Sequence, residues 1–97
     1  MKRVVYHPAV QKDVSAILRH YDGISRRLGD EFWAELMACI ERAAQHPERC
    51  HPADSGQRRV NLRRFPFHFL FRVKPDCIRI TVVRHHKQHP RTGLLRR

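Results

Sequence analysis

The residues best suited to chemistry lie near the end of the chain, in the segment VVRHHKQHP at positions 82–90. This segment begins as the end of an apolar run and turns into a cluster of His, Lys and Arg. Histidine titrates near neutral pH, and basic side chains bind phosphate groups. The segment could therefore bind RNA, cleave RNA, hold a metal ion or only solvate the surface.

A metal site is the weakest of these alternatives. His86 and His89 are separated by two residues, and Cys50 and His51 offer further ligands, but this spacing matches no standard zinc pattern. Histidines in a basic chain more often lie on the surface. We expect no metal and no other cofactor.

Charge is distributed unevenly along the chain, whose formal net charge is +11. Residues 1–54 carry eight basic and eight acidic side chains. Residues 55–97 carry twelve basic side chains and a single carboxylate, Asp76. Such a field favours an anionic partner, either phosphates or an acidic protein segment.

Length and composition predict one globular domain, residues 1–97, with a modest core, since 41% of the residues are hydrophobic. No apolar run approaches the roughly 20 residues of a membrane span, and His7-Pro8 interrupts the apolar start, so we expect neither a membrane segment nor a signal peptide. The chain has three cysteines, an odd number, and they form no CxxC motif. This indicates reduced thiols and a cytoplasmic location.

Hydrophobic periodicity predicts the elements that position the basic residues. Residues 2–6 form a strand that His7-Pro8 ends, and Pro8 suits the first turn of a helix that ends at Gly23. Ser25 is the expected N-cap of a second helix, whose apolar residues recur every four positions up to His46-Pro47. Trp33 widens this stripe, so we expect it in the core.

The second half of the chain predicts a loop at 47–57 and three strands at 58–65, 66–74 and 77–83, followed by a basic tail, 84–97. Apolar and polar residues alternate in the strands, which is typical of an antiparallel sheet with one covered face. The helices would pack on the apolar face, made of Val60, Leu62, Phe67, Phe69, Phe71, Val73, Ile78, Ile80 and Val82. The other face would be open and basic, and would carry Arg59, Arg63, His68, Arg72 and Arg79. The fold class is α+β, with both helices on one side of one sheet.

Three segments in this order resemble the RelE/ParE superfamily of type II toxin–antitoxin toxins. They are the strand and helix VVYHPAVQKDVSAILRHY, the helix end IERAAQHPERCHP, and the strand region RRVNLRRFPFHFLFRVKPDCIRITVVRHHKQHP. The last is similar to the ParE-like plasmid-stabilisation branch. The resemblance implies a βααβββ fold, toxicity when free, and a hetero-oligomer with an acidic antitoxin that carries a DNA-binding domain.

The superfamily's known targets divide between the ribosome with its mRNA, cut by RelE-like members, and DNA gyrase, poisoned by ParE-like members. A metal-independent ribonuclease needs cations for the phosphate and groups that exchange protons. The candidates here are Arg63, His68, Arg72, His85 and His86. The usual ribonuclease set is incomplete, because His68 and Gln88 stand where such members often carry Arg and no tyrosine follows Tyr21.

The sequence therefore favours a ParE-like toxin that inhibits gyrase. The alternatives are a RelE-like endoribonuclease and a plain nucleic-acid-binding module. Leu94 and Leu95 favour docking of the tail, either on the sheet or on the antitoxin. The residues expected to bind the target or the antitoxin are Arg59, Arg63, Arg72, Arg79, Arg84, Lys87, Arg91, Leu94 and Leu95.

Overall fold

A computed structural model describes all 97 residues. The elements in chain order are β1 (Arg3–Tyr6), α1 (Val10–Ile24), α2 (Arg26–Gln45), the 3-10 turn η1 (Pro47–Arg49), β2 (His51–Pro52), the 3-10 turn η2 (Asp54–Gly56), β3 (Arg58–Asn61), β4 (Phe67–Val73) and β5 (Cys77–His85). The predicted α+β class, with one sheet and a helical pair, is confirmed. Neither helix combines the length and the apolar composition that crossing a membrane requires.

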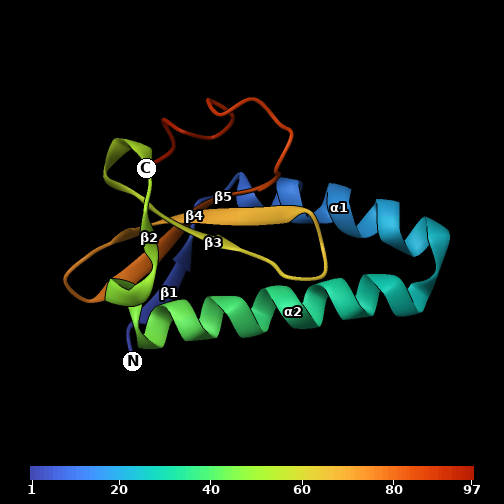
Figure 1. Ribbon diagram of the computed structural model, residues 1–97, viewed down its shortest axis with the longest axis horizontal. Helices are drawn as coiled ribbons and strands as arrows, with labels where there is room; N and C mark the ends of the chain where they lie inside the picture. The colour runs from blue at the N-terminus through green and yellow to red at the C-terminus, as the bar shows by residue number, and fades with distance from the viewer.

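The strands form one mixed sheet in the order β1-β5-β4-β3-β2. β1 runs parallel to β5, and every other neighbouring pair is antiparallel. β5 lies between the first strand of the chain and β4 (Figure 1). Its sequence CIRITVVRH is rich in β-branched residues and almost wholly buried, as expected of a strand covered on both faces.

The two helices form an antiparallel hairpin that covers one face of the sheet (Figure 1). Ser25 is the N-cap of α2, as predicted, since its Oγ accepts the Leu28 N–H at 3.1 Å. α1 begins at Val10, so Pro8 precedes the helix, and α1 continues through Gly23 to Ile24. In the core, Phe32 meets Phe65 and Phe67 edge to face, with ring centroids 5.4 and 5.6 Å apart.

Two predicted boundaries are wrong. The segment 47–57 is not only a loop, because His51 and Pro52 form the edge strand β2 against β3. β3 ends at Asn61 rather than Phe65. After Asn61 the chain turns toward α2, where the Glu35 carboxylate accepts the backbone N–H groups of Arg63 and Arg64, so these residues leave the sheet.

A β-bulge in β5 reverses the predicted facing of the strand's second half. Leu70 pairs with Val82 and the next residue, Phe71, pairs with Ile80, so Thr81 has no partner in β4. Beyond the bulge Val83, not Val82, joins the core beneath the helices. Val82 faces the other side, where it contacts Gly93 of the tail.

The second sheet face is covered, so the prediction of an open basic face is wrong. β5 includes Arg84 and His85, and the C-terminal tail, residues 86–97, crosses the sheet on the side opposite α2 (Figure 1). Beneath the tail and the nearby loop, polar side chains are as buried as the core: Gln57, His68, Thr81 and Arg84 are at most 6% exposed. Docking of the tail on the sheet, one of the two alternatives from the sequence, is what the structure shows.

Candidate functional site

A chain of three hydrogen-bonded side chains lies beneath and beside the tail. Arg84 Nε donates to His68 Nε2 at 2.9 Å, and His68 Nδ1 lies 2.9 Å from His86 Nδ1. Arginine can only donate, so the His68 proton is on Nδ1 and is donated to His86. Neutral His86 therefore carries its own proton on Nε2.

Burial and nearby positive charge keep both histidines neutral. Burial, followed by the charges of Arg59 and Arg84, lowers the pKa of His68 to about 3. Burial and Arg59 also lower the pKa of His86. A protonated His86 would in addition direct an N–H group at the N–H of His68. At neutral pH, Arg84 is the only charged member of this chain.

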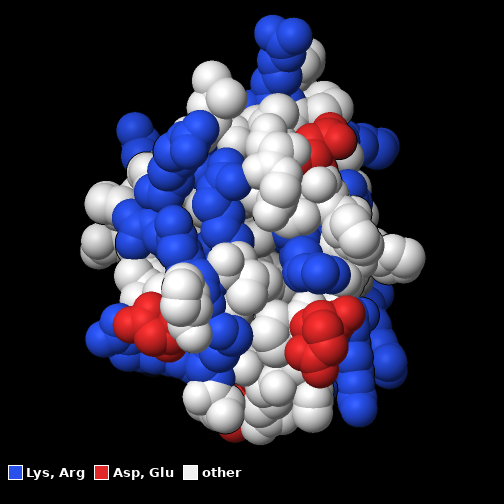
Figure 2. Space-filling view, turned by 90° about the vertical axis from the view of Figure 1, so that its left-hand side faces the viewer, with Lys and Arg blue, Asp and Glu red and all other residues white.

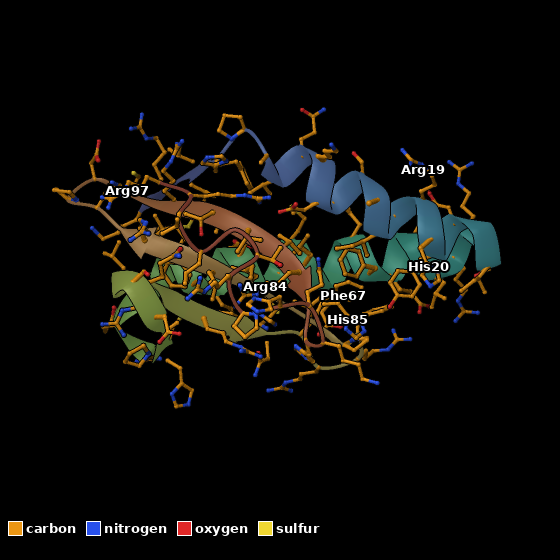
Figure 3. All side chains as sticks on the ribbon, turned by 90° about the horizontal axis from the view of Figure 1, so that it is seen from above. Arg19, His20, Phe67, Arg84, His85 and Arg97 are labelled. Carbon is orange, nitrogen blue, oxygen red and sulfur yellow. The ribbon has the colours of Figure 1, made fainter.

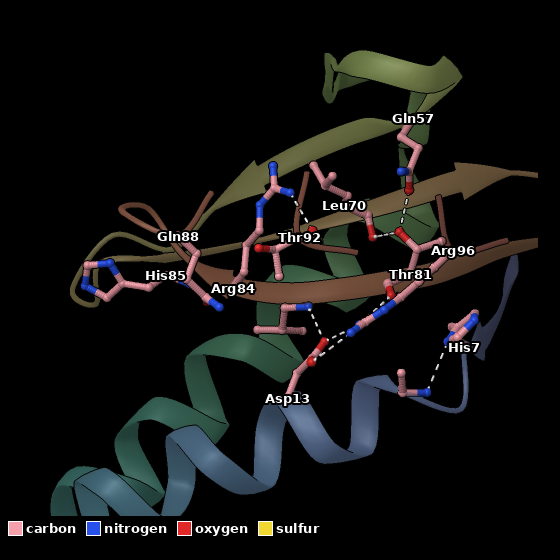
Figure 4. Close-up of polar contacts among 12 residues, drawn as sticks. His7, Asp13, Gln57, Leu70, Thr81, Arg84, His85, Gln88, Thr92 and Arg96 are labelled. Carbon is pink, nitrogen blue, oxygen red and sulfur yellow. Dashed lines mark hydrogen bonds and ion pairs between the residues drawn. The ribbon is translucent and has the colours of Figure 1, made fainter. Parts of the chain in front are cut away.

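The Arg84 side chain also binds backbone carbonyl groups of the tail. Its Nη1 donates to the carbonyl oxygens of Pro90 and Thr92, both at 2.7 Å (Figure 4). Between them and the end of the tail, Gly93 adopts φ +73° and lies against Val82. A buried guanidinium satisfied by main-chain carbonyls is a structural arrangement, and it explains why Arg84 is not free for a ligand.

Further polar contacts fix the rest of the tail. The hydroxyl of Thr81, at the bulge, donates to the Gln57 side chain, whose amide donates to Leu94 O at 3.3 Å. Arg72 Nε donates to Arg96 O at 3.3 Å and its Nη1 to the carbonyl of Ser55 at 2.6 Å. Arg72, a predicted phosphate ligand, is thus engaged with the tail and the η2 turn.

Arg63 lies apart from the other predicted ribonuclease residues. Its backbone N–H binds Glu35 of α2 at 2.5 Å, and its side chain lines two hollows on the α2 side of the molecule. The structure therefore brings His68 together with Arg84 and His86, but not with Arg63. The rings of His85 and Phe67 lie nearly perpendicular to each other, with centroids 5.0 Å apart (Figure 3).

The other predicted binding residues are more accessible. Arg59 is half-buried and its Nε donates to Asn61 Oδ1 at 2.8 Å. Arg79 is half-buried and lies opposite Arg72 in the β4–β5 register. Of the predicted binding residues in the tail, Lys87, Arg91 and Leu95 are exposed, whereas Leu94 is half-buried.

Sequence reasoning missed an apolar groove of about 680 Å³ between the two helices and β1. Trp33 is 46% exposed there and Tyr6 45%, so the prediction that Trp33 belongs to the core is wrong. The adjacent Phe32 takes the core position, and one residue turns the helix by about 100°, which directs Trp33 away from the sheet. Other lining residues include Val14, Leu18, Met37 and Ile40.

Comparison with known proteins decides the family. The model of the family described as "ParE toxin of type II toxin-antitoxin system, parDE" matches residues 4–90. The chain belongs to this family. A search of curated protein sequences found no match.

The fold of this ParE-family protein is also similar to a solved structure described as the chromosomal ParDE TA system from P. aeruginosa. The TM-score is 0.78 and the sequence identity 24%, with 88% of this chain and 96% of the other covered. At that identity the likeness shows the fold. The predicted superfamily is therefore confirmed by the family match, and the predicted fold by this structure.

A sequence signal for the groove does exist in this ParE-family chain. Val14 and Leu18 on α1, and Trp33 and Met37 on α2, widen the apolar stripes beyond the side chains that the sheet covers. An apolar surface left over after the core is filled is typical of an interaction site. The family description names a toxin-antitoxin system, which implies an antitoxin partner.

Proposed function

We propose that the protein is a toxin that inhibits DNA gyrase and that an acidic antitoxin neutralises it. The observation that supports gyrase over mRNA cleavage is the state of the histidine cluster. His68 is buried and neutral, and Arg72 and Arg84 are bound to carbonyl groups of the tail and the η2 turn. Arg72 and Arg84 are therefore not free to bind a phosphate on this sheet face, and both ring nitrogens of His68 are occupied.

Neutralisation is supported by the apolar groove. The antitoxin would place apolar side chains over Trp33 and Met37 and its carboxylates near exposed basic residues such as Lys87 and Arg91. Large aromatic side chains at the centre of an interface contribute most of the binding energy. An acidic segment suits a chain of net charge +11.

The test begins with expression of the protein alone, which we expect to arrest growth, and co-expression with the antitoxin, which we expect to restore it. Purified protein added to gyrase and relaxed plasmid should then block supercoiling. Normal growth at full soluble expression would contradict toxicity. Growth arrest with unaffected gyrase would contradict the target while leaving toxicity intact.

A RelE-like ribonuclease is the second candidate, because His86 is exposed and hydrogen-bonded to a buried partner that fixes its orientation. In that state His86 could donate a proton from Nε2, but its Nδ1 is occupied and unable to accept one. Primer extension on mRNA from induced cells separates the candidates. Discrete breaks within codons would favour the ribonuclease, and intact mRNA with a DNA-damage response would favour gyrase.

A further inference from the structure

A cationic groove runs along α2 on the side of β3 and the β3–β4 loop. It consists of two hollows, of about 640 and 620 Å³, that share Arg42 and Arg63 in their walls. We call this surface the α2–β3 groove. Its arginines are Arg42, Arg49, Arg59, Arg63 and Arg64, and its histidines are His46 and His51.

The carboxylates of the α2–β3 groove are already engaged. Glu31 accepts from Arg27 at 2.9 Å and from Arg64 at 2.8 Å, and both hydrogen bonds lower its pKa, that from Arg64 more. Glu35 accepts the backbone N–H groups of Arg63 and Arg64. Glu35 thus binds the backbone of Arg63 and not its guanidinium group. The Arg63 side chain makes no hydrogen bond or ion pair with the protein.

Arg49 is free in the same way, since its side chain has no hydrogen-bonding partner in the structure, while the neighbouring Glu48 lies 3.7 Å from His46. The groove therefore presents guanidinium groups that other protein groups leave unoccupied. Figure 2 shows the molecule end-on, with Lys and Arg covering much of the surface and Asp and Glu in a few separate patches. A planar guanidinium binds two phosphate oxygens at once, which favours a phosphate ligand.

The rest of the lining indicates which phosphate ligand fits. The apolar residues of the groove are small, namely Ala34, Ala38, Cys39, Ala43, Cys50 and Val60, and no Phe, Tyr or Trp lines it. Single-stranded nucleic acids bind by stacking bases on aromatic side chains, and protein partners bind through large apolar anchors. Neither feature is present, so the groove fits a ligand recognised by its backbone charge alone.

We propose that the α2–β3 groove binds the phosphate backbone of duplex DNA without sequence preference. α2 has 20 residues and is therefore about 30 Å long, close to one helical turn of the duplex. The choice of DNA over duplex RNA rests on the proposed action on gyrase, whose substrate is duplex DNA. The groove lies apart from the apolar groove proposed for the antitoxin, with which it shares no lining residue.

The test is fluorescence anisotropy with the full chain and a labelled 20-base-pair DNA duplex of mixed sequence, between 50 and 200 mM KCl. Each phosphate contact contributes about 0.9 to the slope of log affinity against log salt, or roughly eightfold at 0.1 M. The variant Arg49→Gln/Arg63→Gln removes two side chains that hold nothing in the fold. We expect it to bind roughly 50-fold more weakly, with a slope lower by about two.

The matched control is Arg19→Gln/Arg26→Gln, which removes the same charge from exposed positions outside the groove. Equal loss in both double variants would overturn the proposal, because net charge would then explain the binding. A single strand bound as tightly as the duplex, or an RNA duplex bound more tightly, would overturn the choice of ligand. The choice of ligand would also be overturned if the protein bound poly-glutamate through the groove and did not bind DNA. Because the assay contains no gyrase, its outcome is independent of the gyrase test.

Discussion

Arg96 Nη1 lies 2.7 Å from Asp13 Oδ2, and this ion pair joins the C-terminal tail to the first turn of α1 (Figure 4). The same carboxylate accepts the Val83 N–H at 3.1 Å, and the same guanidinium donates to Thr81 O at 3.2 Å. The pair thus fills the stretch of the β5 edge that β1 leaves unpaired. It connects the tail on one face of the sheet to the helices on the other.

Replacing Arg96 with Gln should release the tail. The ion pair is largely buried, with side-chain exposures of 23% and 15%, so its loss should lower the free energy of unfolding by about 1–3 kcal/mol. Urea unfolding measures this change, and limited trypsin digestion should cut the tail faster. Arg97→Gln, at an exposed neighbouring position, is the control. Equal effects of the two substitutions would show that the ion pair does not hold the tail.

Gly93→Ala should destabilise the tail more than Gly56→Ala. Both glycines have positive φ, +73° and +71°, so both substitutions strain the backbone by about 1 kcal/mol. At Gly93 the new methyl would lie 2.6 Å from two Val82 carbons, whereas nothing lies within 4 Å at Gly56. We expect a total loss of about 2–3 kcal/mol at Gly93. Thermal melts measure both losses, and equal losses in Gly93→Ala and Gly56→Ala would argue against this contact.

Stability should fall in mild acid because of His68. The unfolded chain protonates this residue below its ordinary pKa of about 6.5, whereas the folded chain keeps it neutral until about pH 3. A lowered folded-state pKa means that its full contribution is present above pH 6.5 and is lost as pH falls toward 3, by up to about 1.4 kcal/mol per unit. Urea unfolding at several pH values should show this slope reduced in His68→Gln. A reduction of the same size in His20→Gln, which alters an exposed residue, would contradict the assignment.

Trp33→Ala should weaken binding of the antitoxin and leave the toxicity of the protein unchanged. If Trp33 anchors the antitoxin in the apolar groove, its truncation should cost about 2 kcal/mol or more in binding, roughly 30-fold or greater in Kd. Titration calorimetry measures the affinity, and co-expression should no longer restore growth. Ile24→Ala, exposed and outside the groove, is the control. Unchanged affinity in Trp33→Ala would place the antitoxin elsewhere.

The sequence predicted the helices well because their signals are local. Ser25 caps α2, and the apolar residues that recur every four positions from Phe32 to Ile40 form its buried face. Local signals could not predict which of Val82 and Val83 points toward the helices. Two consecutive valines fit either phase of a strand, and the bulge at Thr81 depends on the pairing with β4.

The covered sheet face was also unpredictable from local pattern. Arginine is seldom buried, and Arg84 was expected to bind the target or the antitoxin. It is buried because carbonyl groups of Pro90 and Thr92 and the ring of His68 satisfy its donors. The carbonyl groups reach Arg84 only because the tail folds back over the sheet, and no local sequence pattern predicts that fold.

The position of β5 in the sheet has a consequence for the order of events in the cell. β1 and β4 both pair with β5, and β5 leaves the ribosome after every other strand. The nascent chain can form its helical hairpin early, but β1 has no neighbouring strand until β5 has emerged. The folded toxin therefore cannot exist before β5 has been synthesised. An antitoxin translated earlier would be present at the moment the toxin acquires its shape.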